Sequence, residues 1–132
     1  MDKIMEQIDL ADLDTTAACD EGAELELVHP RTQVGLGMFI TMYGVDSKIW
    51  RRALSDVGER RARKRGTPSL DEVRAQNIEI LARCTRSWRG IRVDGGEPPC
   101  TYENARALYT RFPWITDQVD AFAGDRGNYI SD

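Results

Sequence analysis

A change in the spacing of apolar residues near position 45 limits the folds that this chain can adopt. Before it, residues 24–27 alternate charged and apolar side chains, and the run 38–43 is rich in strand-forming residues and ends at Gly44. His29-Pro30 stops the first run, so the two runs predict a β-hairpin over 24–44. Two strands alone are marginally stable in water, so helices or a partner's strand must cover or extend the hairpin.

Beyond position 45 the apolar residues recur at helical spacing, and helix-capping residues precede each run. Asp46 or Ser47 can cap the first helix, Ser69 the second and Thr101 the third. We expect four helices, over about 46–65, 69–89, 101–112 and 113–124. The predicted fold is therefore α+β, a mostly α-helical single domain in which an N-terminal β-hairpin packs on about four helices.

Two segments lie outside these elements. Residues 91–93 suit a short strand before the turn at 94–96. Residues 1–22 carry seven Asp or Glu against one Lys, and either a short helix or a frayed tail fits this acidic, flexible segment. We assign it no role in the fold, so the domain covers 23–132. The apolar stripe of the short-helix alternative would contain Ile4, Met5, Ile8 and Leu13.

The composition limits the compartments in which the protein is expected to act and the classes of protein to which it can belong. The chain has 132 residues, enough for one domain, and its three cysteines are widely spaced without a C-x-x-C pair. This pattern favours a reducing compartment over a disulfide framework or a zinc site. No apolar run approaches the roughly 20 residues of a membrane helix, and the start is acidic where a signal peptide would be basic. We expect a cytoplasmic protein without a membrane partner.

The residues available for catalysis do not form a recognisable set. His29 is the single histidine and precedes a proline in an expected turn, and no serine or cysteine lies in an activating motif. The carboxylate pairs Asp94 with Glu97 and Asp117 with Asp120 fall in a turn and on a helix surface, where solvated charges are usual. We therefore expect no enzymatic activity, no cofactor and no bound metal.

Charge is distributed unevenly along the chain. Residues 46–66 carry eight Lys or Arg against three Asp or Glu, a local charge of +5, whereas residues 1–29 carry −8. The cluster Arg60 to Arg65 fits a solvated helix end, a contact with a protein partner, or nucleic acid, the last disfavoured by the overall charge of −4. Trp50, Trp88 and Trp114 fit core positions, with room for one interface anchor.

Four ordered motifs carry a resemblance to a known family. They are WRGIRVDGGEP at 88–98, YENARALY at 102–109, FPWITDQV at 112–119 and DRGNY at 125–129. With the upstream strand pair and Arg-rich helix, the resemblance spans about 24–129 and is to the tail assembly chaperones of long-tailed, siphovirus-like bacteriophages. The chain departs from the family pattern at 99–101 and at Gly127.

The resemblance implies a non-enzymatic protein of the host cytoplasm, absent from the mature virion. Such a chaperone binds the tape-measure protein and keeps it soluble until tail tube subunits polymerise around it. The tail tube protein and a second copy of the chain are further candidate partners. An amphipathic helix in an apolar groove or a strand added to the hairpin would provide the binding mode. As partner-binding residues we predict Trp50, Arg61, Arg65 and Trp88.

Two other readings use the charge runs instead of the motifs. A small phage-encoded inhibitor of a host protein could act through the acidic segment 1–22 as a nucleic-acid mimic. A nucleic-acid-associated protein could use the Arg60 to Arg65 cluster, and its binding would weaken steeply with salt. Only the chaperone reading accounts for the motifs in the C-terminal half.

Overall fold

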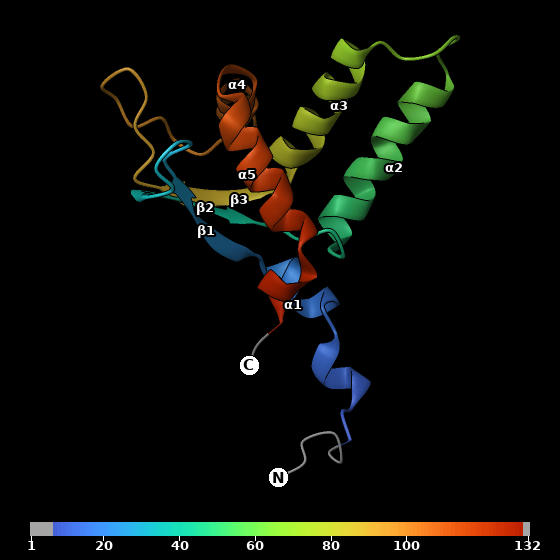
Figure 1. Cartoon of the computed structure of the whole chain (residues 1–132). Coiled ribbons are helices and arrows are strands. Elements are labelled where there is room, and N and C mark those ends of the chain that lie inside the picture. The colour runs from blue at the N-terminus through green and yellow to red at the C-terminus, as the bar shows by residue number, and fades with distance from the viewer. Residues whose placement is uncertain (1–6, 131–132) are drawn as a thin grey trace.

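The predicted hairpin forms and gains a third strand. The computed structural model describes residues 7–130. Its strands are β1 (Ala23–Val28), β2 (Gly35–Met42) and β3 (Thr85–Arg89), in one antiparallel sheet of order β1-β2-β3 (Figure 1). Its helices are α1 (Thr16–Glu21), α2 (Lys48–Ala62), α3 (Leu70–Arg83), α4 (Tyr102–Arg111) and α5 (Pro113–Gly124), with the short 3-10 helices η2 (Leu10–Leu13) and η3 (Arg126–Tyr129). The predicted α+β class is confirmed.

Strand β3 corrects the expected second helix, which ends at Arg83 and not at position 89. Cys84 leaves the helical conformation with φ −95° and ψ 5°, and β3 then pairs with β2, placing Trp88 opposite Ile40. The spacing of Leu81, Cys84 and Trp88 suits a helix. The edge of β2, however, offers backbone donors and acceptors that need partners, and this pairing outweighs a weak local helix preference.

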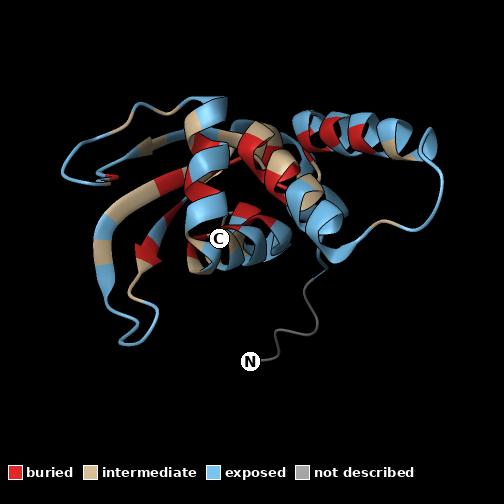
Figure 2. Ribbon diagram, turned by 90° about the horizontal axis from the view of Figure 1, so that it is seen from above, coloured by how far each residue is buried: buried red, intermediate tan, exposed pale blue. Residues whose placement is uncertain are grey.

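The core lies between one face of the sheet and helices α3, α4 and α5, and α2 adds Trp50, Ala53 and Val57 to it. Figure 2 shows buried positions gathered on the inward sides of these elements. The other face of the sheet is polar, and there Arg89 donates to both carboxylate oxygens of Glu24 at 2.9 Å while covering the ring of Phe39. Fully buried core side chains include Leu27, Ile40, Met42, Leu81, Tyr109 and Val119.

The predicted capping residues start the helices. Ser69 and Glu72 form a reciprocal capping box on α3, and the Thr101 hydroxyl accepts a hydrogen bond from the Asn104 N–H on α4 at 3.1 Å. Ser47 caps α2 by accepting from the Trp50 N–H, also at 3.1 Å. Helix α2 ends at Ala62, so residues 63–65 of the Arg-rich run lie in its connection to α3.

Part of the acidic N-terminal segment belongs to the fold, contrary to our expectation. Helix α1 buries Cys19 completely, and its side chain fits because Gly44 has no Cβ, which would overlap the Cys19 sulfur and the Tyr129 ring. The Asp20 carboxylate also accepts from the Lys48 N–H at 2.8 Å, at the start of α2. The helical stripe proposed for this segment does not form over the described residues, since α1 lies after it. Of that stripe, Ile8 and Leu13 are exposed, and Ile4 and Met5 lie outside the described residues.

The segment between β3 and α4 is a structured loop. The strand expected at 91–93 is reduced to one bridge between Val93 and Gly96. Asp94 and Gly95 have φ of 51° and 82°, as a tight type I′ turn requires. Gly90 begins the loop at φ 74°, where a Cβ would lie 2.5 Å from the Gly37 carbonyl oxygen. None of the helices in the described region has the length and apolar character needed to cross a membrane.

Candidate partner-binding grooves

Three of the groups considered for catalysis have structural roles or separate partners. The Nδ1 atom of His29 accepts from the backbone N–H groups of Arg31 and Thr32 and so stabilises its own turn. Asp94 and Glu97 each lie beside a different arginine and do not form an acid–base pair. Within residues 7–130 no group of three or more His, Cys, Asp or Glu is placed to hold a metal ion. The surface of the described region includes two grooves on either side of α4.

The first, which we name the apolar groove, lies between α4, the start of α5, the 90–101 loop and the beginning of β2. It consists of two adjoining hollows of about 410 Å³ and about 140 Å³ that share Val93, Leu108 and Phe112. Such a surface accommodates aliphatic or aromatic side chains of a partner. Its other apolar lining residues are Leu36, Met38, Ile91, Pro98, Ala107, Trp114 and Ile115.

A break between two helices shapes this groove. Phe112 ends α4 and precedes α5 with φ −118° and ψ 83°, because Pro113 disfavours a helical residue before it and cannot donate a backbone hydrogen bond. The turn places the rings of Phe112 and Trp114 edge to face, 6.4 Å apart. Both side chains stay half-exposed, so they present aromatic surface to the groove.

Three contacts hold the loop wall of the apolar groove. The Trp88 indole N–H donates to the Pro98 carbonyl oxygen at 2.9 Å, and the Asn104 side chain donates to the Pro99 carbonyl oxygen at 2.9 Å. Arg111 donates to both carboxylate oxygens of Asp94, at 2.6 and 3.0 Å, and this lowers the pKa of the Asp94 carboxyl. The wall is therefore set before any partner arrives.

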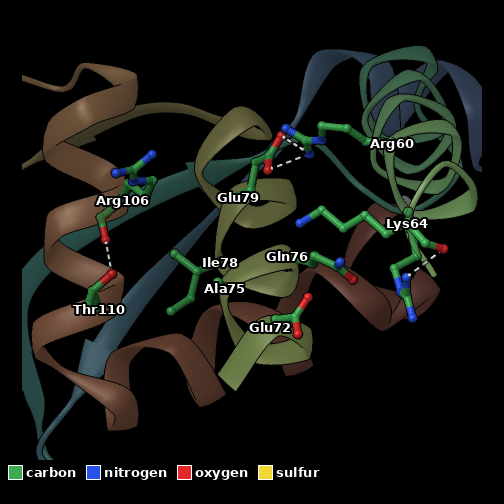
Figure 3. A pocket seen from close by; sticks show the side chains of 10 residues that line it. Arg60, Lys64, Glu72, Ala75, Gln76, Ile78, Glu79, Arg106 and Thr110 are labelled. Atoms are coloured by element: carbon green, nitrogen blue, oxygen red, sulfur yellow. Dashed lines mark hydrogen bonds and ion pairs between the residues drawn. The ribbon is translucent and has the colours of Figure 1, made fainter. Parts of the chain in front are cut away.

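The second groove, which we name the basic groove, runs along α3 between α2 and α4 and measures about 460 Å³ (Figure 3). Its floor is the α3 face containing Glu72, Gln76 and Glu79, spaced by one helical turn. Arg60 donates to both oxygens of Glu79, at 2.7 and 2.9 Å. The remaining lining residues are Arg61, Lys64, Ala75, Ile78, Arg106 and Thr110.

Four cations face two carboxylates in the basic groove, so it has an excess of positive charge. Arg60 is paired with Glu79, and the Arg61 guanidinium donates to the backbone carbonyl oxygens of Lys64 and Gly66. The Arg-rich run is thus divided into residues with different partners. It does not form one uniform cationic stripe of the kind that follows a phosphate backbone.

The four residues predicted to bind a partner do not share one site. Trp50 is 7 % exposed and belongs to the core, so it is not a surface anchor. Trp88 lies on β3 and supports the loop wall of the apolar groove. Arg61 lines the basic groove, and Arg65 is exposed in the α2–α3 connection.

The sequence analysis did not identify Phe112 or Trp114 as groove residues and gave Trp114 a core position. The signal was the F-P-W string, in which a proline separates two aromatic residues at a helix boundary. A search for similar proteins finds no matching family model, no matching curated protein and no matching solved structure. The motifs and the two grooves are therefore the features that bear on function.

Proposed function

We propose that the protein is a tail assembly chaperone of a long-tailed bacteriophage that binds the tape-measure protein through the apolar groove. The observation that supports this proposal is the convergence of three motifs. Residues 88–98, 102–109 and 112–119, which carry the resemblance, all contribute lining to this one groove. The fourth motif, 125–129, lies elsewhere and packs beside Gly44 through Tyr129.

The chemistry of the groove suits an apolar face of a helix. Phe112 and Trp114 offer rigid aromatic surface, and Met38 offers an adaptable side chain that accepts varied aliphatic partners. A long helical tape-measure protein presents such side chains repeatedly, and a helix-in-groove contact would shield them from aggregation. The Arg111–Asp94 pair at the rim adds polar contacts that orient the bound segment.

Binding through this groove is reversible because the hollows are small and no covalent or metal chemistry is required. A site of this size shields a few side chains at a time, which gives modest affinity. Polymerising tail tube subunits, which cover the whole tape measure, would then displace the chaperone. The proposed place of action is the host cytoplasm.

The test is co-expression of this chain with the tape-measure protein of the same genome, followed by pull-down and light scattering. We expect a soluble complex with the wild-type chain. The variant Ala107→Glu places a charge in the groove at an exposed helical position and should leave the tape measure insoluble. Ala121→Glu, at an exposed position of α5 outside both grooves, is the matched control.

Two results would contradict the proposal. One is an insoluble tape measure that does not co-purify with the folded wild-type chain. The other is equal loss of the complex in both alanine variants, since that would show that the apolar groove is not the contact. In the first case the inhibitor reading would be pursued by screening host proteins.

A further inference from the structure

The two acidic residues of the basic groove already have partners inside the domain. The Glu79 carboxylate accepts two hydrogen bonds from the Arg60 guanidinium. The Glu72 carboxylate accepts from the Ser69 N–H at 3.3 Å in the capping box of α3. Both carboxylates therefore serve the fold, and they do not mark the groove as a site for a cation.

Two of the four cations in the groove lack such partners. Arg60 and Arg61 are held by Glu79 and by backbone carbonyl oxygens. Lys64 and Arg106 are exposed and belong to none of the ion pairs formed among residues 7–130. In Figure 3 the Lys64 side chain reaches from the end of α2 toward α3 while Arg106 stands on the α4 wall, so these two charges flank the groove.

The strip between these two cations carries no charge. Ala75 and Ile78 lie there on α3, with the neutral side chain of Gln76 beside them. Ala75 is exposed and has only a methyl side chain, so the surface of a partner can come close to the helix at this point. A groove that follows one helix between two others has the shape that receives a further helix.

We propose that the basic groove binds an acidic amphipathic helix of a partner protein. Asp or Glu side chains on the two flanks of that helix meet Lys64 and Arg106, and a narrow stripe of small or aliphatic residues lies over Ala75 and Ile78. Opposite charges orient the encounter, and the apolar stripe excludes water from the centre of the contact. A nucleic acid fits less well, because its phosphates would lie over two carboxylates and would gain nothing from the apolar strip.

This site is separate from the apolar groove. It uses the side of α4 that contains Arg106 and Thr110, whereas Ala107 and Arg111 face the proposed tape-measure site. One molecule can therefore hold both partners at once, and each interaction can be removed without the other.

The test uses a fluorescein-labelled peptide of about 18 residues, long enough to form a helix, in which a stripe of Ala and Leu is flanked on both sides by Glu. The matched peptide has Gln in place of each Glu. Fluorescence anisotropy with the full chain at about 50 mM salt should give a dissociation constant at least about tenfold lower for the Glu peptide, and about 500 mM salt should remove most of this difference. Equal affinities for the two peptides, or no binding of the Glu peptide, would overturn the proposal.

Charge-reversal variants locate the contact. Lys64→Glu with Arg106→Glu reverses the two flanking charges and should weaken binding of the Glu peptide by at least about tenfold. The control, Arg31→Glu with Arg52→Glu, makes the same charge change at exposed positions outside the groove and should stay within about twofold of wild type. Equal weakening in both variants would overturn the proposal, since it would show attraction by overall charge alone. Circular dichroism verifies that each variant is folded.

A steric variant tests the strip between the cations. Ala75→Trp fills the strip without changing the charge and should weaken binding of the Glu peptide by at least about fivefold. Ala121→Trp, at an exposed position of α5 outside both grooves, is the matched control and should bind like wild type. Unchanged binding in Ala75→Trp would overturn the placement of the helix over α3.

Two further measurements separate this site from its alternatives. The Lys64 and Arg106 variant should still keep the tape-measure protein soluble, and Ala107→Glu should still bind the Glu peptide. Loss of the peptide in Ala107→Glu as large as in the charge-reversal variant would overturn the separate site. So would a labelled DNA duplex that binds the wild-type chain more tightly than the Glu peptide and is released by the charge reversal, since that result would assign the groove to nucleic acid.

Discussion

The apolar groove and the basic groove share helix α4 but are built by different means. Ala107, Leu108 and Arg111 face the first, whereas Arg106 and Thr110 face the second. The walls of the apolar groove are a loop held by backbone carbonyl contacts and a helix break at a proline. The walls of the basic groove are long charged side chains on regular helices.

This difference determines which property of a ligand each groove can recognise. A wall held by hydrogen bonds to its backbone and by a proline break keeps its shape, so the apolar groove is suited to recognising the form of apolar side chains. Long solvated side chains keep their charge but not their position, so the basic groove is suited to recognition by charge. Mutations that move the loop should therefore affect one groove, and salt should affect the other.

The largest expected effect is at Gly90, where the loop of the apolar groove begins. Gly90→Ala requires a side-chain residue at φ 74° and puts a Cβ against the Gly37 carbonyl oxygen. We expect the free energy of unfolding to fall by about 3 kcal/mol, measured by urea denaturation. Gly58→Ala on α2 is the matched control, since nothing lies within 4 Å of its Cβ. It should be neutral or stabilise by up to about 1 kcal/mol. Equal stability of the two variants would contradict a fixed loop wall.

A smaller effect is expected when the loop wall loses a single hydrogen bond. Trp88→Phe removes the donor to the Pro98 carbonyl oxygen and some packing area. Stability should fall by about 1.5 kcal/mol, and tape-measure retention should fall with it. The variant Arg65→Gln, at an exposed position of the α2–α3 connection, should change neither quantity. If the Trp88→Phe variant retained the tape-measure protein as well as the wild type does, the loop wall would not be needed for binding.

Salt should have little effect on binding through the apolar groove. Between about 50 mM and about 500 mM salt, the proposed tape-measure binding should change by less than about twofold, because apolar contacts are not screened by ions. Pull-down at both salt concentrations measures this change. A loss of about tenfold or more would show that charged side chains, such as those of the basic groove, carry the contact.

The contacts of Asp46 with Thr15 and Arg126 give the smallest effect. Arg126 and Thr15 hold the pKa of the Asp46 carboxyl at about 2, below its ordinary value of 3.8. Because the folded-state pKa is lowered, the stabilisation is present above about pH 4 and is lost as the pH falls toward 2. Asp46→Asn should reduce stability by about 1 kcal/mol at pH 7 and by much less near pH 2, as urea denaturation at both pH values would show. An equal loss at both pH values would contradict an ionic role.

Local signals predicted the elements that depend on nearest neighbours. The hairpin follows from strict alternation at 24–27, and the caps at Ser69 and Thr101 follow from side chains that bond the backbone three residues on. Strand β3 could not be predicted this way, because its stabilisation comes from β2, more than forty residues earlier in the chain. Helix α1 was missed for the same reason, since Cys19 is buried by Gly44 and Tyr129.

The sequence by itself determined the α+β class, the positions of the helix starts, the separation of acidic and basic residues, and the motifs that carry the family resemblance. Only the tertiary structure decided that three of those motifs line one groove, that Trp50 is core, and that Arg60 is paired with Glu79. The physical reason is distance along the chain. Capping and periodicity act over a few residues, whereas a groove is made by segments whose contacts form only when the sheet and helices have packed.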